Sequence, residues 1–181
     1  MAESNESSMM PSLIEFFSYD YNFEILQEFI NSKHTRSNKL SIGLLDWFNV
    51  NYAPEYNVEY VIKKGNTEKV ILVWQSYNAA LAGYGKALFD PFARGKSKGE
   101  TITLKNANNS VVTTLRQLNY FRWAIKNGII DFVKNHVIEI YEDMCKRSNR
   151  GRKSDGKKQK LSVSASKTLG RHDIKMTINF G

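Results

Sequence analysis

The chain has 181 residues, 41% of them hydrophobic, with 26 Lys and Arg against 18 Asp and Glu; this suits one domain carrying a formal net charge of +8. No apolar run reaches the roughly 18 residues of a membrane-spanning helix and the first ten residues lack a signal-peptide pattern, so we expect a soluble, intracellular protein without membrane contact. The single cysteine, Cys145, excludes an internal disulfide and a multi-cysteine zinc site.

The first part of the chain predicts helices. Residues 1–10 are polar and rich in Ser and Glu, so we expect them to be disordered. In the second half of residues 13–30, apolar side chains recur at helical spacing, which predicts an amphipathic helix. A polar loop at 31–39 follows. A second helix is expected to begin at Ser41 and to stop at Pro54.

The middle of the chain predicts a β-hairpin and then a helix. Apolar and polar residues alternate over 58–63, and a β-branched and aromatic run occupies 70–74 after a Gly-containing turn, which is typical of a hairpin. Apolar residues next recur at helical spacing over 77–88. Asp90-Pro91 is expected to end that helix.

The following part predicts a second hairpin and two helices. The runs at 101–105 and 111–113 flank an Asn-rich turn, so they form a plausible hairpin. Thr114 and Gln117 have the spacing of a capping box and start a helix. A further helix is expected over 129–144, and together these two helices form a short helical hairpin.

Residues 174–180 alternate apolar and polar side chains, which predicts a closing strand. The predicted class is therefore α+β, a single domain with a small antiparallel sheet of two hairpins and the C-terminal strand, packed by about four to five helices. The expected organisation is a disordered N-terminus at 1–10, a globular domain at 11–145, a basic flexible segment at 146–170 and a closing strand of the same domain at 171–181.

The positive charge is concentrated in one segment. Residues 1–30 contain six acids and no Lys or Arg, whereas residues 146–160 hold eight basic residues and one acid, a net charge of +7. This run has no apolar residue and its charges repel one another, so we expect it to be solvated. Its composition suits phosphate neutralisation. The candidate nucleic-acid-binding residues are Lys146, Arg147, Arg150, Arg152, Lys153, Lys157, Lys158 and Lys160.

Other interpretations of the basic segment stay open. It could be a solvated loop that only keeps the protein soluble. Its two ends, at 146–147 and 157–160, resemble the halves of a bipartite nuclear-import signal. The residues Arg150-Gly151-Arg152-Lys153 resemble a minor-groove hook, in which a flat Arg-Gly-Arg lies along a narrow groove, although the usual proline is absent.

A second candidate for nucleic-acid contact is a group of aromatic and basic residues at 120–126, because aromatic rings can stack on exposed bases. Helical spacing, however, places Phe121 on the same face as Leu118 and Ile125. Such an aromatic stripe usually belongs to the core. We therefore expect core packing for Phe121 and leave Tyr120 and Trp123 open.

Little in the sequence points to catalysis. The three histidines lack the spacing of a metal pair: His34, His136 and His172. Cys145 has no placed histidine partner that would make it a nucleophile. Three acids on the expected 129–144 helix are predicted to form a solvated face: Glu139, Glu142 and Asp143. We expect no enzymatic activity, no metal and no cofactor.

Several segments together carry a resemblance to a known group of proteins. They are Leu44-Leu45-Asp46-Trp47-Phe48 with Asn51-Tyr52, Phe89-Asp90-Pro91-Phe92, the run from Leu115 to Ile125, and the tail from the basic run through 161–167 to 172–175. In these segments the chain resembles small basic proteins encoded by large nucleocytoplasmic DNA viruses. The resemblance covers most of the chain after about residue 20. It implies a viral product that acts on viral DNA, in the virion or in the replication compartment.

Two functions of different class follow. In the first, a non-enzymatic viral protein binds nucleic acid, DNA above all, mainly through its phosphate backbone and through the basic segment. In the alternative, a virion structural protein, a minor capsid or core component, packs against other virion proteins or a second copy, and its basic segment touches an acidic protein surface. A weaker third hypothesis is a modulator of a host protein. The expected location is inside the host, in the viral factory, cytoplasm or nucleus, and in the virion.

Overall fold

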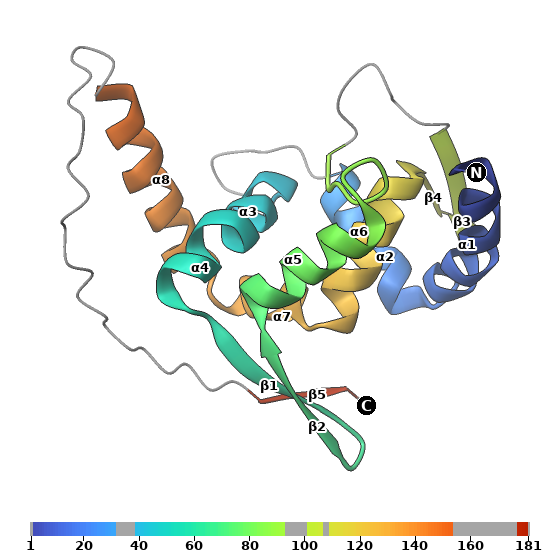
Figure 1. Cartoon of the computed structure of the whole chain (residues 1–181), viewed down its shortest axis with the longest axis horizontal. Coiled ribbons are helices and arrows are strands. Elements are labelled where there is room, and N and C mark those ends of the chain that lie inside the picture. The colour runs from blue at the N-terminus through green and yellow to red at the C-terminus, as the bar shows by residue number, and fades with distance from the viewer. Residues whose placement is uncertain (1, 32–38, 93–100, 107–108, 154–176, 181) are drawn as a thin grey trace.

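Helix α6 lies at the centre of the computed structural model, which describes residues 2–31, 39–92, 101–106, 109–153 and 177–180 (Figure 1). Eight of its twelve residues are buried. The helices around it are α1 (Ala2–Phe17), α2 (Asp20–Asn31), α5 (Val73–Tyr84) and α7 (Ile129–Asn135), and α6 itself spans Leu115–Lys126. With the strands described below, this arrangement confirms the α+β class and the single domain.

Helix α1 begins at Ala2, within the residues for which we expected disorder. Its packing gives a physical reason, because Met9, Leu13 and Phe17 recur at helical spacing and contact the core. Leu13 and Phe17 are buried. The helix also contacts α6, where Arg122 donates a hydrogen bond of 2.6 Å to the hydroxyl of Ser12.

The second predicted helix starts as expected but continues further. The hydroxyl of Ser41 accepts a hydrogen bond from the backbone N–H of Leu44, which confirms the predicted start of α3 (Ile42–Trp47). The prediction that Pro54 stops this helix is wrong, because a π-helical turn, η1 (Phe48–Tyr52), precedes it and α4 (Ala53–Tyr56) contains it. The chain leaves the helix at Asn57, whose φ of 47° is left-handed.

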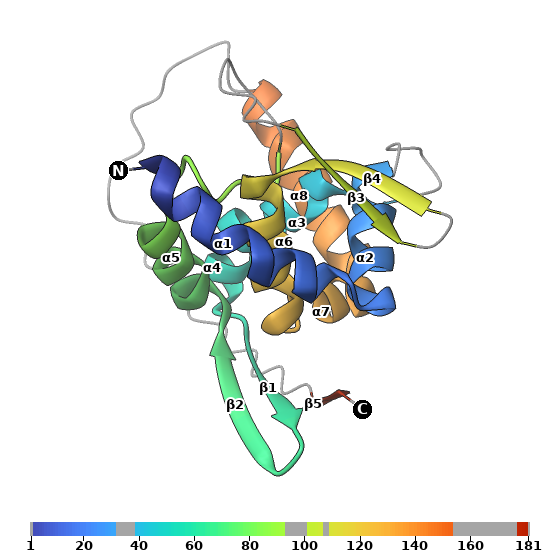
Figure 2. The same ribbon diagram turned by 90° about the vertical axis from the view of Figure 1, so that its right-hand side faces the viewer.

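Both predicted hairpins are confirmed, and they lie in separate sheets. Strand β1 (Glu59–Lys64) pairs with β2 (Thr67–Leu72), and β3 (Thr101–Asn106) pairs with β4 (Asn109–Thr114). The C-terminal strand β5 (Thr177–Phe180) joins β1 in parallel, with Ile62 opposite Ile178. Figure 2 shows the β1–β2 hairpin extending below the helices, while β3 and β4 lie across α2. Val73 and Trp74, which we expected at the end of the first hairpin, begin α5 instead.

Two of the segments that carry the viral resemblance, residues 89–92 and the run from Leu115 to Ile125, contact each other; most of the tail lies outside the described residues. From α6, the side-chain amide of Gln117 donates to the carbonyl of Pro91 at 3.1 Å, and that of Asn119 donates to the carbonyl of Leu88 at 3.0 Å. The ring of Phe89 lies 5.5 and 5.6 Å from two aromatic rings of α6. The Phe-Asp-Pro-Phe segment is thereby fixed against α6 by hydrogen bonds and by ring packing.

Phe132 of α7 is the centre of an aromatic stack that joins the first hairpin to the helices. Its ring centroid lies 5.0 Å from that of Tyr60, 5.2 Å from that of Phe48 and 4.2 Å from that of His136. The hydroxyl of Tyr60 donates a hydrogen bond of 2.7 Å to the carbonyl of Asn127, where α6 ends. These contacts attach β1 to the corner between α6 and α7.

The helix predicted over 129–144 is two helices. The first, α7, ends at Asn135. The next residue, His136, has a φ of −117°, which is not helical, and α8 (Val137–Lys153) follows it. The stacking of His136 on Phe132 holds the chain at this break. The second helix continues beyond residue 144 into the basic run.

We predict that Phe132→Ala destabilises the protein by about 3–5 kcal/mol, because it leaves a cavity among three rings. The free energy of unfolding, measured by urea denaturation and circular dichroism, checks this. Val112→Ala is the matched control, since this side chain is 59% exposed and should change stability by no more than about 0.5 kcal/mol. Equal effects of the two substitutions would contradict the central position of Phe132.

Candidate nucleic-acid interface

Helix α8 carries a large part of the basic segment. Five of the eight candidate residues lie on it, namely Lys146, Arg147, Arg150, Arg152 and Lys153. The other three, Lys157, Lys158 and Lys160, lie outside the described residues. The first part of α8 contacts α3, η1 and α7, whereas its C-terminal part extends beyond the other helices (Figure 1).

Opposite charges one turn apart support the extension of α8 past Met144, where we expected it to end. Glu142 lies 3.5 Å from the ammonium of Lys146, and Asp143 lies 3.6 Å from the guanidinium of Arg147. Acid-to-base pairs at this spacing, with the acid on the N-terminal side, stabilise a helix by a few tenths of a kcal/mol. Cations near the C-terminus of a helix also interact favourably with its dipole.

Helical geometry places the basic positions on different sides of α8. Positions 146, 150 and 153 follow i, i+4, i+7 spacing and therefore share one side of the helix. Position 147 lies about 100° further around, because a turn contains about 3.6 residues. A minor-groove hook needs extended backbone, so the helical conformation of residues 150–153 argues against that hypothesis.

The adjacent residues Lys146 and Arg147 differ in their surroundings. The side chain of Lys146 is 71% exposed, and that of Arg147 is 30% exposed. Besides Asp143, the guanidinium of Arg147 contacts the carboxylate of Glu55 at 3.8 Å and lies 5.4 Å above the ring of Trp47. Lys146 is thus open to a partner, whereas Arg147 faces the body of the domain.

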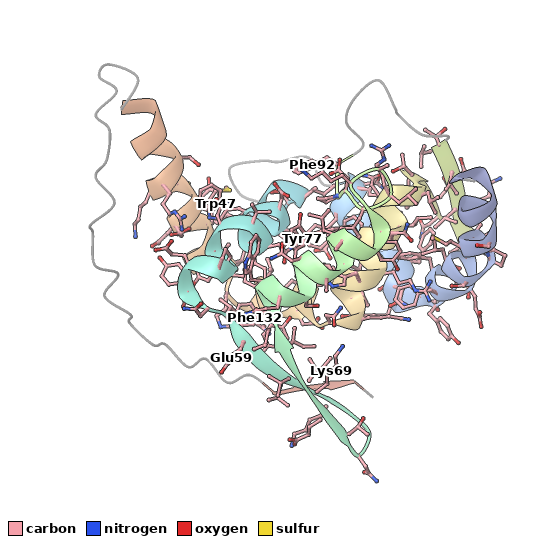
Figure 3. All side chains as sticks on the ribbon, viewed as in Figure 1. Trp47, Glu59, Lys69, Tyr77, Phe92 and Phe132 are labelled. Carbon is pink, nitrogen blue, oxygen red and sulfur yellow. The ribbon has the colours of Figure 1, made fainter. Side chains whose placement is uncertain are left out.

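Asp143 joins α8 to the preceding helices. Only 9% of this residue is exposed, so the prediction of a solvated acidic face is wrong at this position. Its two carboxylate oxygens accept hydrogen bonds from the indole N–H of Trp47 at 2.8 Å and from the hydroxyl of Tyr56 at 3.1 Å. Burial, together with the Asp143 carboxylate, raises the pKa of Tyr56. Trp47 lies where α3 meets α8 (Figure 3).

We call this set of contacts the α8 junction; its members are Trp47, Glu55, Tyr56, Asp143 and Arg147. Its two members on α8 follow Ile140, which is fully buried, at i+3 and i+7. Helical spacing therefore puts both charges on the buried side of the helix. The sequence contained one signal for the junction: an acid and a base four residues apart, at i+3 and i+7 from a buried isoleucine.

The aromatic and basic group at 120–126 does not form a stacking platform for bases. Its three aromatic side chains are buried, which confirms the expectation for Phe121 and settles the other two as core: Tyr120, Phe121 and Trp123. Arg122 and Lys126 lie 5.8 and 5.6 Å from the ring centroid of Phe16 on α1. These cations attach α1 to α6.

Within the described part of the chain, no group of three or more His, Cys, Asp or Glu side chains is placed to hold a metal ion. Nδ1 of His136 lies 2.9 Å from the carbonyl of Phe132, and the two other histidines fall outside the described residues. Cys145 is a half-buried free thiol. Among the same described residues, no helix is long and apolar enough to cross a membrane.

The hydroxyl of Tyr52, on η1 beside the junction, should make the stability of the fold depend on pH in the alkaline range. Burial, with a contribution from Glu139, raises the pKa of Tyr52 from 10.0 to about 12. Because the folded pKa lies above the unfolded one, the stabilisation by the neutral hydroxyl is complete below pH 10 and is lost as the pH rises through about 12. We therefore expect the free energy of unfolding to fall between pH 10 and 12.

Tyr52→Phe has no hydroxyl to ionise, so its stability should fall less steeply over this range. Urea unfolding followed by circular dichroism at a series of pH values measures both curves. Tyr19→Phe is the matched control, because Tyr19 is 64% exposed, and it should follow the wild-type curve. A Tyr52→Phe curve parallel to that of the wild type would refute the prediction.

Two comparisons with known proteins give a match. The family described as "Family of unknown function (DUF7197)" matches residues 3–177. The chain is also 36% identical over 155 residues to "Uncharacterized protein L507" of Acanthamoeba polyphaga mimivirus. That alignment covers 83% of this chain and 58% of the relative, so the chain spans little more than half of the relative's length. No solved structure matches the chain.

Proposed function

The chain belongs to the DUF7197 family of unknown function, and we propose that it is a viral, non-enzymatic protein that binds nucleic acid, DNA above all, through phosphate contacts of its basic segment. The observation that supports this function best is the position of α8, whose basic C-terminal part extends beyond the other helices. The mimivirus relative supports a viral setting.

The charges around α8 support phosphate contact on one side of the helix. Lys146 is largely exposed, and its only described ion pair is a long one with Glu142, itself 58% exposed. Such a surface pair contributes little stability and is easily exchanged for another anion. Positions 150 and 153 continue the same side of the helix, so three cationic residues follow one line. A line of cations suits the regular negative charge of a nucleic-acid backbone.

The alternative is a virion structural protein, a minor capsid or core component, that acts by packing against other proteins. Large apolar side chains on the surface favour it. Val70 and Leu72 on β2 are 60% and 43% exposed, and β2 is an edge strand among the described strands. In this function the basic segment would contact an acidic protein surface or packaged DNA. We place either function inside the host cell or in the virion.

We predict that neutralising one side of α8 lowers the salt dependence of DNA binding. The variant is Lys146→Gln with Arg150→Gln and Lys153→Gln. If each residue contacts one phosphate, the slope of log affinity against log salt should decrease by about 2.7, since each contact contributes about 0.9. Fluorescence anisotropy of a labelled duplex, between about 50 and 200 mM salt, measures the slope.

The matched control removes the same charge from surface positions elsewhere, Lys63, Lys86 and Lys105, each changed to Gln; Lys63, like Lys146, forms a surface ion pair with a glutamate. It should retain most of the wild-type slope, because the net charge alone does not produce local contacts. Equal losses in the two variants would show that only the net charge matters. Absence of wild-type binding at about 50 mM salt would exclude the nucleic-acid function and leave the structural one.

A further inference from the structure

We propose that the α8 junction fixes the direction of α8, and that Asp143 and Arg147 are positioning residues rather than contacts to a partner. The functional consequence of this inference, which is the placement of the basic side of α8 toward a polyanion, rests on the proposed function. Its geometric part stands on described contacts alone. Those contacts join residues about ninety positions apart in the chain, from α3 and α4 to α8.

The first step concerns Asp143. A carboxylate that is 9% exposed needs hydrogen-bond donors or a counter-ion, because burial of an unpaired charge is costly. Each of its oxygens accepts from one aromatic donor, the indole of Trp47 or the hydroxyl of Tyr56. Hydrogen bonds to a charged acceptor are stronger than neutral ones. Two such bonds from two different helical segments restrict both tilt and rotation of α8.

The second step concerns Arg147, one helical turn further on. Its guanidinium lies between the carboxylates of Asp143 and Glu55, at 3.6 and 3.8 Å, with the ring of Trp47 at 5.4 Å. A planar guanidinium can contact two carboxylates and a ring together, which an ammonium does less well. Any phosphate that recruited Arg147 would have to displace these groups.

The third step concerns the three basic positions on one side of α8. Residues 146, 150 and 153 belong to the same helix as the junction, so the direction of α8 sets the direction of their side of the helix. The junction therefore decides where a bound polyanion lies relative to the domain. Arg147 is counted in the basic segment by sequence, but its role is internal.

The first test needs no partner. Two spin labels, at Ser148→Cys on α8 and Lys86→Cys after α5, are placed in a Cys145→Ser background, and pulsed electron resonance gives their distance distribution. We expect a narrow distribution, and a broader one after Asp143→Asn. Glu142→Gln is the matched control, because it removes the same charge from the neighbouring position, whose side chain is 58% exposed. An unchanged distribution in Asp143→Asn would overturn the proposal.

The second test measures duplex DNA binding by the unlabelled full chain. Charge alone predicts that Asp143→Asn and Glu142→Gln both tighten binding, by up to about fivefold, because each removes a negative charge. The positioning proposal predicts opposite signs. Asp143→Asn should weaken binding by about threefold or more, while Glu142→Gln tightens it. Tightening by both variants would overturn the proposal.

Tyr56→Phe provides a variant without any change of charge, for use if Asp143→Asn fails to fold. It removes one donor to Asp143 and should also broaden the distance distribution and weaken binding. No change in either measurement would overturn the inference. If the wild type binds no DNA but the distance distribution broadens as expected, the proposed function fails while the junction stands, so the two failures are distinguishable.

Discussion

Burial of most of α6 imposes the constraint on which the rest of the structure depends. Its buried polar side chains have little access to water and must find partners inside the domain. Gln117 and Asn119 find them in backbone carbonyls of the segment after α5, which is thereby held against the helix. Tyr120 accepts a hydrogen bond of 2.7 Å from Asn49 on η1. The need to satisfy these groups thus places segments that are distant in sequence.

The same physical rule acts a second time at α8. Asn49 connects the helical segment from α3 to α4 with α6, and Trp47 and Tyr56 connect that segment with Asp143 on α8. The segment from α3 to α4 is therefore attached to α6 through Asn49 and to α8 through Trp47 and Tyr56. A change in the packing of η1 would reach both places, because the two sets of hydrogen bonds share one short stretch of backbone.

Local signals in the sequence predicted the parts of the fold that depend on neighbouring residues. The hydroxyls at Ser41 and Thr114 cap helices as expected, since a cap needs only groups three residues away. The predictions failed where distant contacts decide. Pro54 remains inside a helix, because the π-helical turn before it depends on packing. The burial of Asp143 was not predicted, because its hydrogen-bond donors come from residues about ninety positions earlier. The basic residues could be recognised from composition, but the internal role of Arg147 could be recognised only once its contacts with Glu55, Asp143 and Trp47 were known.

A basic segment that is partly helical meets a polyanion under different conditions from a flexible run of the same charge. Ordering the backbone of one residue costs about 1–2 kcal/mol, and residues 146–153 are ordered in α8 without a partner. Binding through them avoids that cost. The helix also limits the number of contacts, because its basic positions lie on different sides and Arg147 faces Glu55 and Asp143. The net charge of the segment is therefore an upper bound on its phosphate contacts. The helix makes fewer contacts than a flexible run could, but it holds its basic positions in a fixed direction relative to the domain.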